Sequence, residues 1–265
     1  MNILDTIAAK QKEYVKTITS KKKVDELKNK GRDLSYDRRN FFNSLQSSPL
    51  KPALIAEFKR QSPSKGVLGD ERSPIPRVKE YEHRGAAAIS VLTEQFFFRG
   101  SSEDLITARA AVSIPVMRKD FIVDEYQIFE TSSWPADAIL LIARLLSRHQ
   151  LDDYLCICNE LRLDALIEVF SLDELEWVLE CPVKIIGVNN RNLETFETSL
   201  KTSSEIISLL PDNLLTVSES GIYKADDISK VHNDGYDAVL IGESLMKTPI
   251  DDLNDKISSL YEDVR

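Results

Sequence analysis

The chain has 265 residues, of which 42% are hydrophobic and 29% are charged. That is enough to fill a core and cover it, which excludes wholesale disorder and leaves one barrel-sized domain or two smaller ones. The net charge of −9 argues against a general affinity for nucleic acid or anionic membranes. No apolar segment approaches the roughly 20 residues of a membrane span, and the polar start is unlike a signal peptide, so we expect a cytoplasmic protein.

The charge is unevenly distributed along the chain. Residues 1–51 contain 12 Lys and Arg against 6 Asp and Glu, whereas the rest is strongly acidic. We interpret the lysine run at 21–23 as a solvated helix face. The three cysteines are odd in number and do not form a disulfide framework, so we expect them to be reduced. The histidines, His83, His149 and His232, lack the spacing of a zinc site, so we expect no metal and assign any acid–base chemistry to Glu and Lys.

In chain order, the first predicted elements are helical. Apolar residues recur at helical intervals from Asn2 to about Lys30, and Gly31 interrupts the pattern. A second, short helix is expected over Tyr36–Leu45. We therefore predict that residues 1–50 form an N-terminal helical extension packed on a unit made of residues 51–265.

From residue 53 onward, short apolar runs alternate with longer amphipathic segments, which indicates strands and helices around a parallel sheet. The eight runs are Ala53–Phe58, Ala87–Leu92, Ile114–Arg118, Ala136–Ile142, Asp164–Val169, Val183–Val188, Leu214–Ser218 and Tyr236–Ile241. Eight units are the number that closes a (β/α)8 TIM barrel of the α/β class. An open doubly wound sheet is the competing fold, but no Gly-x-Gly-x-x-Gly follows the first run.

Charged and polar residues gather where these runs end, which in such a barrel is the site of chemistry. Because side chains alternate along a strand, those on the same face as the apolar interior residues should point into the barrel mouth. They comprise three carboxylates, three cations and an amide: Glu57, Glu168, Glu219, Lys59, Lys119, Arg191 and Asn189. Glutamates with different neighbours can act as an acid and a base at one pH, although Glu57 and Glu219 could instead form structural ion pairs.

Three further segments point to a ligand at the mouth. Gly221 and Gly242, after runs 7 and 8, suggest a phosphate site built from backbone N–H groups, in which Glu243 would turn its carboxylate away. The loop Ser62–Gly66 is long enough to fold over a ligand or simply to connect two elements. The aromatic run Phe96–Phe98 could stack on a ring or pack beneath a loop.

Five motifs in these segments closely resemble the indole-3-glycerol-phosphate synthase family. They are Ile55-Ala56-Glu57-Phe58-Lys59-Arg60-Gln61-Ser62-Pro63-Ser64-Lys65-Gly66, Arg118-Lys119-Asp120-Phe121, Leu166-Ile167-Glu168-Val169, Ile186-Gly187-Val188-Asn189-Asn190-Arg191-Asn192-Leu193 and Ser218-Glu219-Ser220-Gly221-Ile222. The resemblance runs in order through essentially the whole chain.

The resemblance implies a (β/α)8 barrel of tryptophan biosynthesis that closes the indole ring of 1-(2-carboxyphenylamino)-1-deoxyribulose 5-phosphate, releasing carbon dioxide and water without a cofactor. It also implies roles for individual residues. Lys119 would be the general acid and Glu168 its proton-transfer partner, while Glu57 and Asn189 would stabilise developing charge, Glu219 would support the network, and Lys59 would hold the substrate anion and is a second candidate proton donor. Substrate would be bound by Ser62, Phe98 and Arg191, and its phosphate by Ser220, Gly221, Gly242 and Glu243.

Three positions depart from the family pattern: Trp134, Phe170 and Arg99. A Schiff-base aldolase remains an alternative, because a lysine at a strand end can attack a carbonyl covalently. A barrel that only binds a phosphorylated metabolite is the other. We expect a small phosphorylated substrate, a monomer or weak homodimer, and a basic extension that partly covers the mouth.

Overall fold

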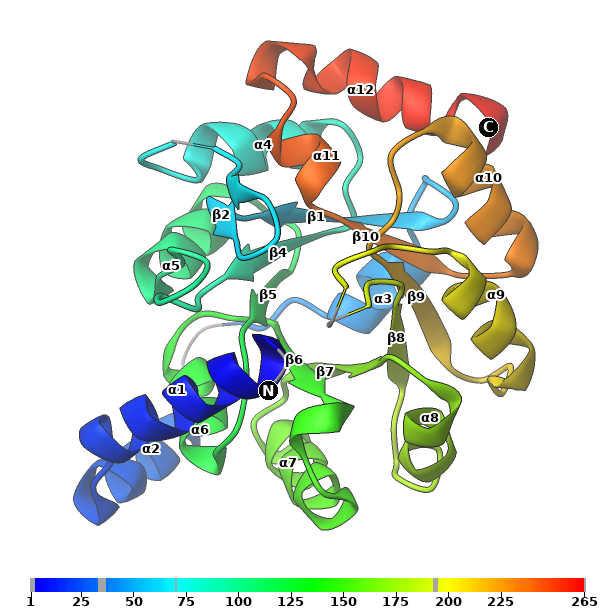
Figure 1. Cartoon of the computed structure of the whole chain (residues 1–265). Coiled ribbons are helices and arrows are strands. Elements are labelled where there is room, and N and C mark those ends of the chain that lie inside the picture. The colour runs from blue at the N-terminus through cyan, green and yellow to red at the C-terminus, as the bar shows by residue number, and fades with distance from the viewer. Residues whose placement is uncertain (1–2, 33–36, 70, 193–194, 265) are drawn as a thin grey trace.

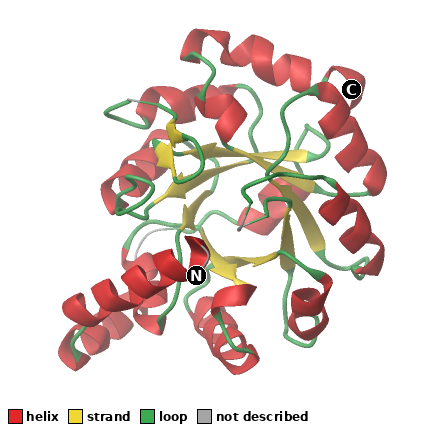
Figure 2. Cartoon of the chain, viewed as in Figure 1, coloured by secondary structure: helices red, strands yellow, loops and turns green. Residues whose placement is uncertain are grey.

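The computed structural model describes residues 3–32, 37–69, 71–192 and 195–264. Eight parallel strands form a closed barrel, with the order β1-β10-β9-β8-β7-β6-β5-β4 around the ring. The barrel strands are β1 (Ala53–Phe58), β4 (Ala88–Leu92), β5 (Val116–Lys119), β6 (Ala138–Ile142), β7 (Asp164–Val169), β8 (Ile185–Asn189), β9 (Leu215–Glu219) and β10 (Ala238–Ile241). Figure 2 shows the strands as a central ring with helices around it. The predicted TIM barrel is confirmed.

Helices follow the strands and cover the outside of the ring (Figure 1). They are α4 (Ile75–His83), α5 (Ser102–Ala111), α6 (Glu125–Ser133), α7 (Arg148–Glu160), α8 (Leu172–Val178), α9 (Lys201–Ile206), α10 (Ala225–Asp234), α11 (Glu243–Met246) and α12 (Leu253–Leu260), with short 3-10 turns at Ala143–Leu145, Ile207–Leu209, Ile250–Asp252 and Glu262–Val264. Within the described residues, no helix is both long and apolar enough to cross a membrane.

The strands are buried on both faces, as expected of a parallel sheet covered by helices. Alternate residues divide between two cores. Ile55, Leu166 and Ile185 belong to the core inside the barrel, whereas Leu54 and Ile186 face the helices. This alternation directs Glu57, Glu168 and Asn189 toward the axis of the barrel at its carboxyl end.

The N-terminal helices differ from the prediction. The expected single helix from Asn2 to Lys30 is two helices, α1 (Ile3–Ile18) and α2 (Lys21–Arg32), because Ser20 accepts a hydrogen bond from the Lys23 N–H and starts a new helix. α2 also continues through Gly31. The predicted starting residue Asn2 lies outside the described residues.

The second predicted helix is shorter than expected. α3 is Phe41–Gln46, and it starts at Phe41 because the Asn40 side chain accepts the Asn43 N–H at 2.7 Å. Its predicted start at Tyr36 lies outside the described residues. Phe41 and Leu45 are buried in the core inside the barrel, so α3 closes the N-terminal end of the ring.

The loop after β1 is also more ordered than predicted. It contains a small antiparallel hairpin, β2 (Gln61–Ser62) and β3 (Gly66–Val67), in which Gly66 has a left-handed φ of 67°. The ends of several barrel strands are displaced by one or two residues from the predicted runs. In particular, Lys119, Asn189 and Glu219 are the last residues of their strands, because the parallel ladder extends to them.

Candidate active site

A pocket opens at the carboxyl ends of the strands and has a volume of about 910 Å³ when its open mouth is included. It is lined by every predicted site residue except Ser62: Glu57, Lys59, Phe98, Lys119, Glu168, Asn189, Arg191, Glu219, Ser220, Gly221, Gly242 and Glu243. Ser62 lines an adjoining cavity that shares Lys59, Phe98, Arg191 and Glu243 with the pocket. The fold thus gathers predicted site residues that are up to 186 positions apart in the sequence, from Glu57 to Glu243.

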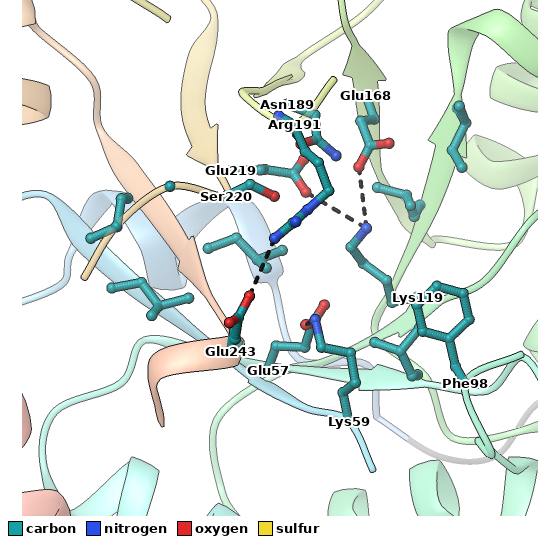
Figure 3. Close-up of a pocket in the computed structure, with 18 of the residues that line it drawn as sticks. Glu57, Lys59, Phe98, Lys119, Glu168, Asn189, Arg191, Glu219, Ser220 and Glu243 are labelled. Atoms are coloured by element: carbon teal, nitrogen blue, oxygen red, sulfur yellow. Dashed lines mark hydrogen bonds and ion pairs between the residues drawn. The ribbon is translucent and has the colours of Figure 1, made fainter. Parts of the chain in front are cut away.

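Lys119 lies at the centre of the pocket between two buried carboxylates (Figure 3). Its Nζ is 3.1 Å from Glu168 Oε2 and 3.7 Å from Glu219 Oε2. Burial by itself lowers the pKa of Lys119, but the charges of Glu168, Glu219 and Glu57 outweigh burial and raise the pKa above its usual value. The side chain is therefore an ammonium ion throughout the physiological pH range.

The Glu219 carboxylate is buried and only partly hydrogen-bonded. It is 1% exposed, and its Oε1 atom has no hydrogen-bond partner among the described residues. Burial, followed by the neighbouring Glu168, raises the pKa of Glu219 well above its usual value, although Lys119 opposes this shift. The pocket therefore contains a carboxyl group with a raised pKa beside the charged Lys119 side chain.

Two further groups of charges lie around this centre. At the end of β1, the ammonium group of Lys59 pairs with the Glu57 carboxylate. At the edge of the mouth, Arg191 Nη2 is 3.4 Å from Glu243 Oε2. Glu243 Oε1 is 2.7 Å from Lys247 Nζ and 3.9 Å from Lys65 Nζ.

The expectation that Glu243 turns its carboxylate away from a bound phosphate stays a prediction, and in this structure the carboxylate pairs with cations at the rim. Figure 3 shows the carboxylate directed at Arg191. Although burial raises its pKa, Lys247, Lys65 and Arg191 together lower it below the usual value. The carboxylate points toward these cations because three nearby positive charges stabilise an ionised glutamate.

The turn after β9 has an unusual backbone. Ser220 and Gly221 both have left-handed φ angles, 65° and 83°. The buried Asn190 side chain supports the turn by donating to the carbonyls of Glu219 and Ser220 at 3.0 and 3.3 Å. Successive residues of this kind form concave surfaces that can present backbone N–H groups to an anion.

Asn190 was not among the predicted site residues, and its position beside Asn189 was the available signal. The predictions also missed pocket residues that include Leu4, Phe121, Phe170, Tyr223 and Ser244. Leu4 is on α1, more than fifty residues before the next lining residue, so no local pattern connects it with the pocket.

An aromatic wall closes one side of the pocket. The Phe98 and Phe121 rings have centroids 5.8 Å apart. The backbone at Phe98 is fixed by a carboxylate. The buried Glu94 side chain accepts hydrogen bonds from the backbone N–H groups of Phe96, Phe97 and Phe98 at 2.7 to 3.0 Å. Phe96 itself packs edge-on against Tyr14 of α1.

The three departures from the family pattern have distinct environments. The Arg118 guanidinium lies 4.2 Å from the Trp134 ring centroid, and that of Arg144 lies 4.9 Å from the Phe170 ring centroid. Arg99 has a left-handed φ of 52°. Over the described ranges, no group of three or more His, Cys, Asp and Glu side chains is arranged to hold a metal ion.

Comparison with known proteins agrees with this geometry. The family model of indole-3-glycerol phosphate synthase matches residues 4–260. The indole-3-glycerol phosphate synthase of Chlorobium phaeovibrioides is 47% identical over 207 residues, which cover 78% of this chain and 80% of the relative. That of Aliarcobacter butzleri is 40% identical over 250 residues, covering 93% and 94%.

Solved structures share the fold at low sequence identity. A chain of the tryptophan synthase complex from Pyrococcus furiosus has a TM-score of 0.60 at 14% identity, covering 80% of this chain and 98% of that one. The thiamine phosphate pyrophosphorylase from the same organism has a TM-score of 0.59 at 17% identity, covering 84% and 96%. These two likenesses establish the barrel fold alone. The family-wide match and the identities of 40 to 47% establish more: the chain belongs to the indole-3-glycerol phosphate synthase family.

Proposed function

We propose that this protein is an indole-3-glycerol-phosphate synthase, a carboxy-lyase of tryptophan biosynthesis. Its substrate would be 1-(2-carboxyphenylamino)-1-deoxyribulose 5-phosphate. The observation that carries the proposal is the Lys119 ammonium between Glu168 and Glu219, in a pocket whose rim holds further cations. Membership of the family supports the same reaction.

Ring closure requires a proton on the ketone oxygen of the substrate while the aromatic carbon attacks the carbonyl carbon. We assign this proton to Lys119, which is charged and lies at the centre of the pocket. The attack yields a cationic ring that acts as the electron sink when the carboxylate leaves as carbon dioxide. No additional group is needed for that step.

Loss of carbon dioxide restores the benzene ring, and dehydration then makes the new five-membered ring aromatic. The dehydration requires a base for one proton and an acid for the departing hydroxyl. Glu168 accepts a hydrogen bond from Lys119 at 3.1 Å and is suited to exchange a proton with it. Glu57 and Asn189 would stabilise the charge that develops nearby, Glu219 would support the network, and Lys59 would bind the substrate anion and is a second candidate donor.

The edge of the pocket is suited to the anionic groups of the substrate. We assign the phosphate to the backbone at Ser220, Gly221, Gly242 and Glu243, and substrate contacts to Arg191, Ser62 and Phe98. The left-handed turn at Ser220 and Gly221 supports this assignment. For Arg191 to bind the substrate, it must exchange its Glu243 partner for the incoming anion.

A Schiff-base aldolase is less compatible with this arrangement. Such an enzyme needs a neutral amine and therefore a lysine with a depressed pKa. Here the carboxylates around Lys119 raise the pKa instead. The pocket thus favours an ammonium acid over an amine nucleophile.

The remaining assignments concern the protein as a whole. We infer a monomer or weak homodimer. We infer a cytoplasmic location, where reducing conditions suit the free Cys156, Cys158 and Cys181. We also propose that residues 1–50 act as an extension of the barrel 51–265, with Leu4 at the mouth and Phe41 and Leu45 at the opposite end.

The test is a turnover assay on the proposed substrate, with the fluorescence of the indole product as the readout. We expect turnover, and no permanent label on Lys119 when borohydride is added with substrate. A correctly folded protein that binds the substrate without forming indole would contradict the proposal. Covalent trapping at Lys119 would indicate the aldolase instead.

A further inference from the structure

Two glycines lie directly beside glutamates of the pocket. A Cβ atom added to Gly187 of β8 would overlap Glu219 Oε1 and lie 3.2 Å from Glu219 Cδ. A Cβ atom added to Gly242 would overlap Glu57 Oε1 and lie 2.9 Å from Glu57 Cδ. In both cases the space that any other residue would fill is taken by a carboxylate.

Backbone conformation does not explain glycine at position 187. Gly187 does not have a positive φ, so an L-residue could adopt its backbone conformation. It lies in the interior of a strand, where glycine normally weakens the sheet. The parallel ladders place it opposite Glu168 on one side and Val217 on the other. What position 187 requires is therefore space.

We propose that Gly187 is a positioning residue for the reaction, whose missing side chain creates the space that holds the Glu219 carboxylate beside Lys119 and Glu168. This inference rests on the proposed function. Glu219 would act on the proton network, and Gly187 would act only through Glu219.

The contacts of Glu219 support this role. Oε2 is 3.7 Å from Lys119 Nζ, whereas Oε1 has no hydrogen-bond partner among the described side chains and backbone. With so few polar contacts, the shape of the cavity fixes the carboxylate. Burial there also raises the pKa of Glu219, so displacement toward solvent would return the pKa toward its usual value.

Gly242 repeats the arrangement for Glu57, but it also belongs to the proposed phosphate site. A substitution there would disturb two functions at once. Gly187 provides the cleaner test, because the nearest atom outside Glu219 to a Cβ at this position is Leu166 Cδ1 at 3.2 Å, at the end of a flexible side chain.

The experiment is a double-mutant cycle of wild type, Gly187→Ala, Glu219→Ala and the double variant, measured by turnover and by thermal melting. In the wild-type background, Gly187→Ala should lower kcat about 100-fold with little change in KM, and should lower Tm. In the pH–rate profile of Gly187→Ala, the pKa that belongs to Glu219 should move toward acid pH. In the Glu219→Ala background the same substitution meets no carboxylate, so it should change kcat by less than about twofold and leave Tm equal or higher.

Equal losses in both backgrounds, or unchanged turnover in Gly187→Ala, would overturn the inference. If Gly187→Ala alone fails to fold, folding of the double variant supports it and failure of both overturns it. The melting cycle requires no turnover. Absence of indole formation by the wild type would therefore contradict the proposed function, while the melting data would still test the fit between Gly187 and Glu219.

Discussion

The two ends of the barrel use buried carboxylates in opposite ways. At the N-terminal end, Asp137 is saturated: its two oxygens accept the Arg39 and Val116 N–H groups, both at 2.8 Å, and two hydrogen bonds from Arg109. At the mouth, Glu219 has one oxygen without a hydrogen-bond partner in the described part of the chain, and it shares Lys119 with Glu168. At the N-terminal end both Asp137 oxygens are hydrogen-bonded, whereas at the mouth Glu168 and Glu219 lie close to the same lysine.

The carboxylates at the N-terminal end therefore serve stability, whereas those at the mouth are arranged for chemistry. Asp137 is held in place because backbone and guanidinium donors surround it, and Asp164 likewise accepts the N–H groups of Phe41 and Phe42 at the start of α3. These bonds attach the N-terminal segment to the barrel. Among the described residues, Glu219 at the mouth accepts no backbone or guanidinium hydrogen bond, so its ionisation depends on burial, on Glu168 and on Lys119, the arrangement that proton transfer requires.

The largest expected effect is on turnover at the mouth. Lys119→Ala should lower turnover by roughly 10² to 10⁴, the usual contribution of one acid–base group. Indole fluorescence measures the loss, and circular dichroism checks that the variant is folded. A folded variant with normal turnover would remove Lys119 from the mechanism and with it the contrast between the two ends.

The converse effect is expected at the N-terminal end. Asp137→Ala leaves the partly buried Arg109 charge and two backbone N–H groups without this acceptor, so unfolding should require about 3 to 5 kcal/mol less. Urea denaturation measures this change. At a temperature where the variant remains folded, kcat should stay within about twofold of wild type, and a large fall in kcat would show that the two ends are coupled.

The raised pKa of Glu219 makes a prediction about pH. Because the folded-state pKa exceeds the unfolded value, both states are protonated at low pH, and the folded state loses stability as the pH rises through this window. The glutamine in Glu219→Gln cannot ionise. The variant should therefore be as stable as wild type at low pH and more stable than wild type at higher pH. Each kcal/mol of added stability should raise Tm by roughly 2 to 4 °C. Parallel melting curves across about pH 4 to 8 measure the difference, and a difference that does not vary with pH would contradict the raised pKa.

The smallest effect is expected at the rim. Glu243→Gln removes the carboxylate that holds Arg191, so the cation becomes available to the substrate anion and KM should fall by roughly twofold to fivefold. The control is Glu205→Gln, which makes the same charge change in an exposed ion pair with Lys201 on α9. A rise in KM would mean that Glu243 helps to bind the substrate through its side chain.

Local patterns predicted much of this structure. The apolar runs identified all eight strands, because a strand buried on both faces must be apolar along its whole length. The period of two along each strand predicted that Glu57, Lys119, Glu168 and Glu219 share the mouth, since alternation and a closed ring leave inward residues nowhere else to point. The predicted ends of the strands were less accurate, because the length of a hydrogen-bonded ladder depends on the neighbouring strand.

Contacts between distant segments were not predictable in this way. Leu4 lines the pocket and Phe41 fills the opposite end only because the extension packs on a barrel whose shape no helical pattern encodes. The ion pairs of the Glu243 carboxylate were not predicted either, because Lys65, Arg191 and Lys247 meet only in the folded chain.

The amino-acid sequence by itself determined the barrel, the family and the set of ionic residues at its mouth, because these depend on local periodicity and on short motifs. The tertiary structure decided which charges pair, which oxygen has no partner among the described residues and which glycine lies beside that oxygen. Those properties depend on distances of a few ångströms between strands, and such distances exist only once the ring has closed.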